Sequence, residues 1–238
     1  HSSPRTSPDQ EDVCRPRRFL LTANTQDSKQ WFLPALLWLL VLFVTAWAYN
    51  PGINGPAMLD DRASVMVLNV LEKNPDYAID AVLGDNAGPL GRPVAMATFV
   101  LEKLYFDGGI SGSKKINILL HLLNGCMVLW LFTLLFSPLE NPAASWLAVL
   151  LAASWLLSPM YVSTVLYVVQ RMAILAAFFM LAACISYLYW RLSLSAGNFS
   201  SIRLVLVFLF IVLAVFSKET AIVIVPILLL LEALWLGF

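Results

Sequence analysis

Charged residues are scarce in this sequence, and their scarcity indicates the class of protein. Only 13% of the 238 residues are Asp, Glu, Lys or Arg, whereas soluble domains carry about 25%. Hydrophobic residues make up 60% of the chain, and the mean hydropathy is +0.78. The formal net charge is zero, so no excess of positive charge favours nucleic acid as a partner. This composition is typical of a polytopic membrane protein.

Cysteine is scarce as well, with Cys14, Cys126 and Cys184 its only occurrences. The three are far apart and lack the spacing of metal ligands, so the sequence does not indicate a zinc site or a disulfide framework. Cys126 and Cys184 lie inside apolar runs, where a free cysteine packs as a small hydrophobic residue.

Long apolar runs account for most of the chain, and they predict an all-α, polytopic transmembrane helical bundle. A helix rises about 1.5 Å per residue, so about 20 residues cross a hydrocarbon core of roughly 30 Å. The fifth run is short, because its thirteen residues make only about 20 Å of helix. We expect about six spans, at residues 31–49, 116–136, 143–157, 172–190, 204–216 and 221–236.

Basic residues near the span ends predict the orientation. Lys and Arg are enriched on the cytoplasmic side of membrane proteins, and Arg15, Arg17, Arg18 and Lys29 all precede the first run. This places 1–30 in the cytoplasm as a disordered tail. The segments 50–115, 158–171 and 217–220 then share the outer face. We expect 31–238 to be one transmembrane module, truncated at its C-terminus because it stops inside an apolar run.

Polar residues near the spans are the candidates for function, since an unpaired charge in hydrocarbon costs about 2.5–3.5 kcal/mol on insertion scales. For several of these residues a purely structural role is an alternative. Lys218 and Glu219 also fit a tight turn whose charges reach water. His121, one turn inside the second span, also fits a packing residue bonded to Asn117 or Asn124. On the predicted outer face lie Asp60, Asp61, Arg92, Gln170, Arg171, Lys218 and Glu219.

The outer loop 50–115 contains patterns for two amphipathic juxtamembrane helices. The first begins in "LDDRASVMVLNVLEKN", where one aspartate of the pair fits an N-cap. The other aspartate is then free to act as a general base or to hold a cation. The second helix lies in "GPLGRPVAMATFVLEKLYF", with Val94, Thr98 and Leu101 spaced for one face.

Five segments in order carry a resemblance to a known family. They are "LDDRASV", "GPLGRPVAMATF", "INILLHLLNG", "SPMYVSTVLYVVQRMAILAAFFMLAACISYLY" and "FSKETAIVIVPILLL". Together, from about residue 30 to the end, the chain resembles C-type integral-membrane glycosyltransferases. Within that superfamily it is similar to bacterial protein O-mannosyltransferases and transmembrane–tetratricopeptide O-mannosyltransferases. We expect fewer spans in these residues than such enzymes have, and the residues include no soluble or repeat segment of the kind that often follows their spans.

The resemblance implies an enzyme of the bacterial inner (plasma) membrane. It would move a sugar from a polyprenyl-phosphate-linked donor to a protein or glycan hydroxyl on the outer face, by inverting attack. Asp60 or Asp61 would be the base, and Arg171 and Lys218 would neutralise the leaving phosphate. Arg92, His121, Gln170 and Glu219 would shape the pocket. No cofactor is certain; a divalent cation, if one takes part, would be held by Asp60 and Asp61.

Two other classes of protein fit the same residues. A transporter or flippase for a lipid-linked or anionic solute would also need charges within the membrane. A non-catalytic membrane assembly subunit would use those charges for helix packing. An O-antigen polymerase or ligase is a neighbouring variant of the enzyme hypothesis.

Overall fold

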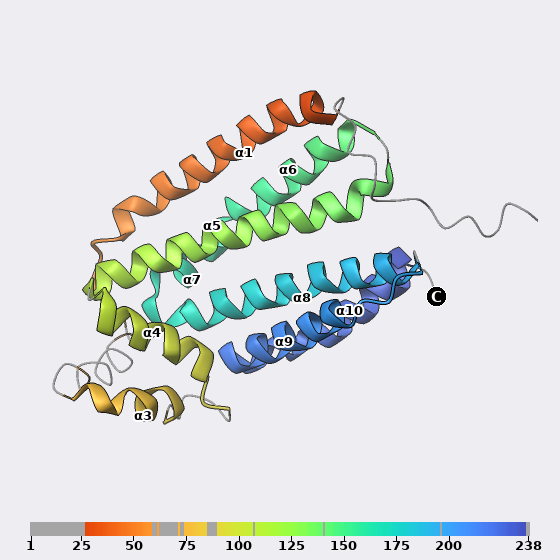
Figure 1. Cartoon of the computed structure of the whole chain (residues 1–238). Helices are drawn as coiled ribbons and strands as arrows, with labels where there is room; N and C mark the ends of the chain where they lie inside the picture. Colours follow the sequence, from red (N-terminus) through yellow and green to blue (C-terminus); the bar gives the residue numbers. More distant parts are fainter. Residues whose placement is uncertain are drawn as a thin grey trace, which may run out of the picture.

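The structure is a computed structural model that describes residues 27–58, 61, 71, 74–84, 90–106, 108–139, 141–195 and 197–236. Over these residues the chain is helical and contains no strand (Figure 1). Most of the predicted tail 1–30 and of the first amphipathic helix, together with Asp60, lies outside them. The α-helices are α1 (Asp27–Tyr49), α3 (Ala78–Leu83), α4 (Pro93–Tyr105), α5 (Gly109–Phe136), α6 (Ala143–Leu156), α7 (Val162–Leu166), α8 (Arg171–Ser195), α9 (Ser201–Ser217) and α10 (Ile224–Leu231).

Shorter helical turns join these elements. The 3₁₀ turns are η2 (Asn50–Gly52), η3 (Pro75–Tyr77), η4 (Ser137–Leu139), η5 (Pro159–Tyr161), η6 (Val168–Gln170) and η7 (Glu219–Val223). A π-helical turn, η8 (Glu232–Leu236), follows α10. Helix α1 begins at Asp27, four residues before the predicted span, so the helix extends into the segment predicted as tail.

Among the described residues, three to four helical segments are long and apolar enough to cross a membrane. Trp31–Gly52, Gly109–Leu139 and Val168–Ser195 each suffice alone, and Ala143–Leu156 with Pro159–Leu166 form a fourth span bent by 40°. The predicted all-helical fold is thus confirmed for the described residues, and their apolar helices fit the predicted membrane class, whereas six spans are not confirmed. The reason is length, because α9 has 17 residues and α10 has eight before the π turn.

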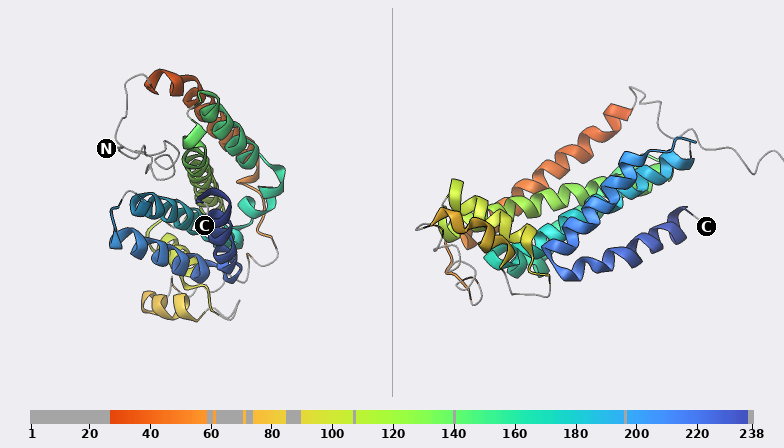
Figure 2. Two further views of the ribbon diagram at one scale, coloured as in Figure 1. Left: turned by 90° about the vertical axis from the view of Figure 1, so that its right-hand side faces the viewer. Right: turned by 60° about the horizontal axis from the view of Figure 1, so that its bottom comes forward.

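The long helices lie lengthwise beside one another, and α3 and α4 are gathered at one end (Figures 1 and 2). This end, which we call the α4 end, also holds the end of α1, the start of α5, the α6–α7–α8 connection and the α9–α10 connection. The opposite end, the far end, holds the start of α1, the α5–α6 connection and the α8–α9 connection. The three predicted outer segments therefore have their described residues at the same end.

Small side chains allow the helices of the bundle to approach closely. Lipid tails are as apolar as leucine, so association of spans relies on close packing. Ala183 of α8 and Ala214 of α9 are fully buried. A Cβ on Gly125 of α5 would lie 2.8 Å from the Leu156 side chain of α6, which shows how closely α5 and α6 pack. Helix α8 is central, because 56% of its 18-residue apolar stretch is buried. In the corresponding stretch of α1 only 22% is buried, so α1 is peripheral.

Helix α4 forms where the second amphipathic helix is predicted, but it buries a different face. Its buried apolar residues are Ala95, Met96, Phe99 and Val100, whereas Leu101 of the predicted face is 53% exposed. Val94, Thr98 and Leu101, which were predicted to share one face, are therefore not the residues that α4 buries most. Apolar residues occur around most of α4, and such a pattern cannot tell the face that meets protein from the face that meets lipid.

Candidate functional site at the α4 end

Arg171, the first residue of α8, is the largest fully buried side chain among the described residues. Its side chain is 0% exposed, and its Nη2 lies 2.6 Å from Oε2 of Glu102 on α4. The Arg171 Cζ atom also lies 4.2 Å from the centre of the Phe99 ring. A cation at a helix N-terminus is opposed by the helix dipole, so the carboxylate of Glu102 offsets an otherwise unfavourable position.

Side chains of α5 complete this buried network. Arg171 Nε donates to Asn117 Oδ1 at 3.0 Å, and Arg171 Nη2 donates to the Ser113 carbonyl at 3.2 Å. The Ser113 hydroxyl donates to Glu102 Oε1 at 2.7 Å. The remaining Nη1 atom has no hydrogen-bond partner among the described residues. The network joins α4, α5 and α8, so it fixes α4 on the bundle.

Asp61 connects the loop after α1 to the start of α8. It is fully buried, and its Oδ1 accepts a hydrogen bond from the Val169 backbone N–H at 2.9 Å. Its Oδ2 accepts one from the Met58 N–H at 3.1 Å. Asp61 therefore accepts one hydrogen bond from a residue three positions earlier in the chain and one from η6. Asp60, its predicted partner, lies outside the described residues.

Arg92 and Glu219 meet although they are separated by 127 positions in the chain. Arg92 Nε lies 3.2 Å from Glu219 Oε2, and both side chains are partly exposed. Arg92 Nη1 also approaches the Met172 sulfur at 2.9 Å. A hydrogen bond from its own backbone N–H, together with the nearby Arg92 and Lys218 charges, lowers the pKa of Glu219 below its usual value. Arg92 has φ 50° and ψ 44°, an uncommon left-handed conformation for a non-glycine residue.

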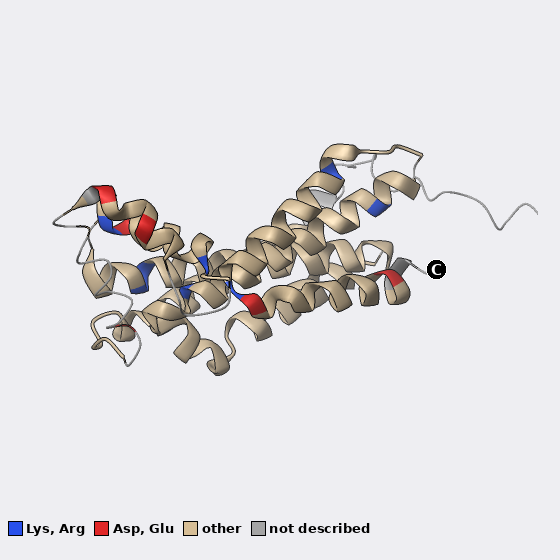
Figure 3. Ribbon diagram, turned by 90° about the horizontal axis from the view of Figure 1, so that it is seen from below, with Lys and Arg blue, Asp and Glu red and all other residues tan. Residues whose placement is uncertain are grey.

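Lys218 and Gln170 also lie together, because Lys218 Nζ donates to Gln170 Oε1 at 3.4 Å. Gln170 directly precedes Arg171, and Lys218 directly precedes Glu219. The α4 end therefore gathers Asp61, Arg92, Gln170, Arg171, Lys218 and Glu219 from four separate segments of the chain. Figure 3 shows charged residues concentrated there, with fewer at the far end.

His121 lies one turn beyond Asn117 on α5, within a group of aromatic rings. Its ring centre is 5.4–5.6 Å from those of Tyr49, Trp155 and Tyr161. Its Nε2 lies 3.2 Å from the Leu156 carbonyl oxygen. The partner expected for a packing histidine, Asn117 or Asn124, is therefore not the one found. The structure does not join His121 directly to the charged residues around Arg171.

Sequence reasoning missed several partners of the site. Glu102, Ser113, Lys114 and Asn117 are all buried at the α4 end. The sequence did contain a signal for Glu102 and Lys114. Each is a charged residue that lies in or next to a predicted helix of mostly apolar residues.

A second polar group lies at the far end. The Glu232 carboxylate of η8 accepts hydrogen bonds from the Tyr187 hydroxyl at 2.5 Å and from Arg191 Nε at 2.9 Å. It ties the last helical segment to α8.

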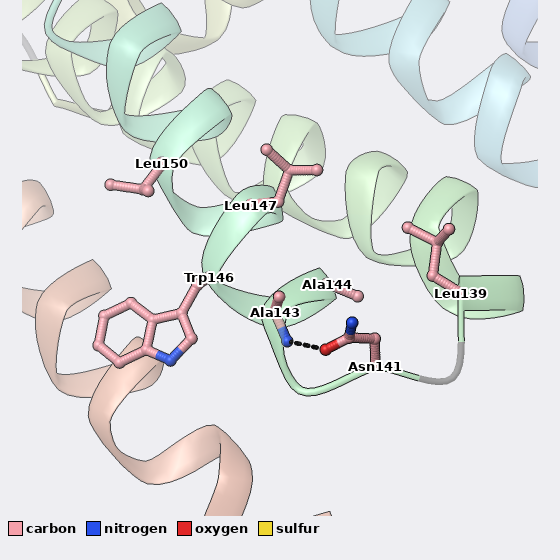
Figure 4. A pocket seen from close by; sticks show the side chains of 7 residues that line it. All are labelled: Leu139, Asn141, Ala143, Ala144, Trp146, Leu147 and Leu150. Carbon is pink, nitrogen blue, oxygen red and sulfur yellow. Dashed lines mark hydrogen bonds between the residues drawn. The ribbon is translucent and has the colours of Figure 1, made fainter.

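Two cavities lie beside α6 and neither is lined by the charged residues. One, of about 240 Å³, is lined by Thr45 and Tyr49 of α1 and by Ser158, Val162 and Leu166 among others. The other, of about 380 Å³ at the far end, is lined by Leu139, Asn141, Ala143, Ala144, Trp146, Leu147 and Leu150. There Asn141 Oδ1 accepts the Ala143 N–H at 2.9 Å, and the Trp146 ring points toward α1 (Figure 4).

The described residues contain no group of three or more His, Cys, Asp and Glu side chains that is arranged to hold a metal ion. No protein-family model, curated protein or solved structure matches this chain.

Proposed function

We propose that the chain is the membrane module of a glycosyltransferase that moves a sugar from a polyprenyl-phosphate-linked donor to an acceptor hydroxyl of a protein or glycan. One observation carries the proposal. Arg171 and Lys218, the Glu102 carboxylate that pairs with Arg171, and the helix α4 all lie at one end of the bundle. A donor phosphate held at the headgroup level needs cations at that depth. In this proposal the protein crosses the inner membrane six times and the α4 end faces outward.

The two adjacent aspartates have different roles in this proposal. Both oxygens of Asp61 accept backbone hydrogen bonds, so Asp61 holds the loop in place. Asp60 is then the base that takes the proton of the acceptor hydroxyl as it attacks the anomeric carbon.

Lys218 is the first cation that a donor phosphate would meet. Its Nζ donates to the neutral amide of Gln170, and its charge lies near the partly exposed Glu219. Arg171 is neutralised by Glu102, but its Nη1 retains an unused donor. We therefore propose that Lys218 binds the leaving phosphate directly and that Arg171 supports it from within the bundle.

Transport of a lipid-linked or anionic solute is the second candidate function. The buried Arg171–Glu102 pair favours it, because ionisable groups inside membrane bundles often mark solute or ion pathways. The two functions differ in whether a glycosidic bond is made.

Substitution of Asp60 in the full-length protein tests the enzyme hypothesis. Asp60→Asn should lower the rate of sugar transfer from a polyprenyl-phosphate-linked donor by about 10²–10⁴-fold, the usual contribution of a general base. Asp80→Asn, on the exposed face of α3, is the matched control and should transfer at the normal rate. Normal transfer by Asp60→Asn in a folded protein would remove the base assignment.

Vesicles containing the same proteins separate the two functions. Glycosyl transfer should require donor and acceptor on the outer face and leave no net movement of donor across the bilayer. Movement of the lipid-linked sugar without formation of any glycoside would favour the transporter instead.

A further inference from the structure

We infer that Lys114 is a positioning residue for the reaction, because it holds the loop that presents the Asp60–Asp61 pair. This inference rests on the proposed function and adds to it a residue that contacts no substrate. Lys114 lies in the second turn of α5 and is 2% exposed. It is therefore a cation that the fold has withdrawn from water at the α4 end.

The Lys114 ammonium is surrounded by carbonyl oxygens of one loop. Its Nζ donates to the Gly55 carbonyl at 2.8 Å, and to those of Gly52 and Pro56 at 3.3 Å each. An ammonium has three donors and no acceptor, so these three carbonyls match its full capacity. The loop that follows α1 is thus wrapped around a fixed charge on α5.

Two glycines allow the loop to approach so closely. A Cβ on Gly55 would lie 3.3 Å from Lys114 Nζ and 3.2 Å from the Gly52 carbonyl oxygen. A Cβ on Gly52 would lie 2.3 Å from the Leu166 side chain of α7. A larger residue at either position would force the neighbouring side chain, Lys114 or Leu166, or the loop itself to shift.

Further along the chain, Asp61 makes a second contact with the bundle. Pro56 is four residues before Asp60, and Asp61 is bonded to Val169. Gly52, Gly55 and Pro56 are therefore held by a cation of α5, and Asp61 is held by a backbone N–H of η6. A displacement of about 1 Å in a reacting group can lower a rate by about 10²-fold, so the loop position matters to the base.

A cysteine-labelling experiment tests the position of the loop without any sugar transfer. In full-length protein without Cys14, Cys126 and Cys184, Ile53→Cys reports on the loop, since Ile53 packs against Tyr49, Ile118 and Val165. Lys114→Met should raise its rate of maleimide labelling by about tenfold, as expected for local opening of a loop. Lys115→Met is the matched control, because Lys115 is the next residue and is exposed.

Transfer kinetics test the consequence for the reaction. Lys114→Met should lower kcat by about tenfold or more and leave the donor KM within about twofold, because the donor's cations are untouched. Gly55→Ala keeps the lysine and should give the same pattern in a weaker form, which covers the case in which Lys114→Met does not fold. A merely structural role would reduce the amount of folded protein without this split between kcat and KM.

Two results would overturn the inference. One is unchanged labelling of Ile53→Cys in both Lys114→Met and Gly55→Ala, and the other is faster labelling with normal kcat. Failure of the proposed function looks different. The parent protein would then transfer no sugar, while the labelling rates would still decide whether Lys114 holds the loop.

Discussion

At the scale of single residues, the buried Arg171–Glu102 pair makes a strong prediction about stability. Removal of one partner from a buried ion pair typically costs about 3–5 kcal/mol, because it leaves an uncompensated charge. Glu102→Gln should therefore lower the free energy of unfolding in detergent by about this amount. Glu219→Gln removes a carboxylate from a partly exposed arginine pair and should cost no more than about 1 kcal/mol.

A double variant separates the pair from general effects of the site. Glu102→Leu with Arg171→Leu removes both charges, so the two substitutions together should cost less than the sum of the single ones by about 2 kcal/mol or more. Additive effects in a thermal unfolding assay would mean that the two charges do not depend on each other.

The Arg92–Glu219 pair predicts a dependence of stability on pH. The pKa of Glu219 is lowered in the folded protein, so its ionised form favours folding. This contribution is fully present above the unfolded-state pKa and is lost as the pH falls through the folded-state pKa. The stability difference between the parent protein and Glu219→Gln should therefore be present at pH 7 and vanish at low pH. A constant difference down to pH 3 would contradict the assignment.

At the same scale, the sequence showed where polar residues lie but not what they contact. Arg171 and Lys218 could be placed at one end because they flank apolar runs, and the structure puts them there. Glu102 could not be assigned to Arg171, since 69 positions separate them and the register of α4 on α8 is set by packing. The pattern predicted an N-cap at one aspartate of the Asp60–Asp61 pair, but it could not predict that Asp61 bonds Val169.

At the scale of elements, one polar stripe on α5 supports the breaks in the other helices. Asn117 donates to the Tyr167 and Val168 carbonyls beside η6, and His121 contacts the Leu156 carbonyl at the end of α6. In lipid, backbone groups freed at a helix break need partners from the protein. The stripe is visible in the sequence as polar residues three to four positions apart, while the breaks that it serves are not. It consists of Ser113, Lys114, Asn117, His121 and Asn124.

Asn117 is the central residue of that stripe, and its substitution tests this role. Asn117→Leu keeps a similar volume but removes two donors to carbonyls and the acceptor for Arg171 Nε. Buried groups left unpaired cost about 1–3 kcal/mol each, and charged ones more, so we expect a loss of stability of at least about 3 kcal/mol. Leu119→Ala, on the exposed side of α5, is the control and should change little. Equal melting temperatures for Asn117→Leu and the parent protein would contradict the role.

At the scale of the whole molecule, hydropathy predicted the class and the alternation of ends but not the number of crossings. Long helices such as α5, with 28 residues, exceed a roughly 30 Å core at about 1.5 Å per residue. Helix α9 reaches only about 25 Å with its 17 residues. Whether such a helix crosses depends on tilt and local thinning of the bilayer, and composition alone does not fix either.

The six-span arrangement requires α9 to cross, and accessibility of single cysteines tests this. Met160→Cys and Thr220→Cys lie in exposed positions at the α4 end, and Phe199→Cys lies in an exposed position at the far end. In a background without native cysteines, an impermeant maleimide added outside intact cells should label positions 160 and 220. Position 199 should be labelled only after the membrane is opened, because a crossing helix puts its two ends on opposite sides. A 25 Å helix can meet this demand by thinning the bilayer at a modest cost per ångström. Labelling of both 199 and 220 from outside would mean that α9 is re-entrant. Labelling of 160 without 220 would place the segment of Gln170 and the segment of Lys218 on opposite sides of the membrane, which would rule out the proposed site.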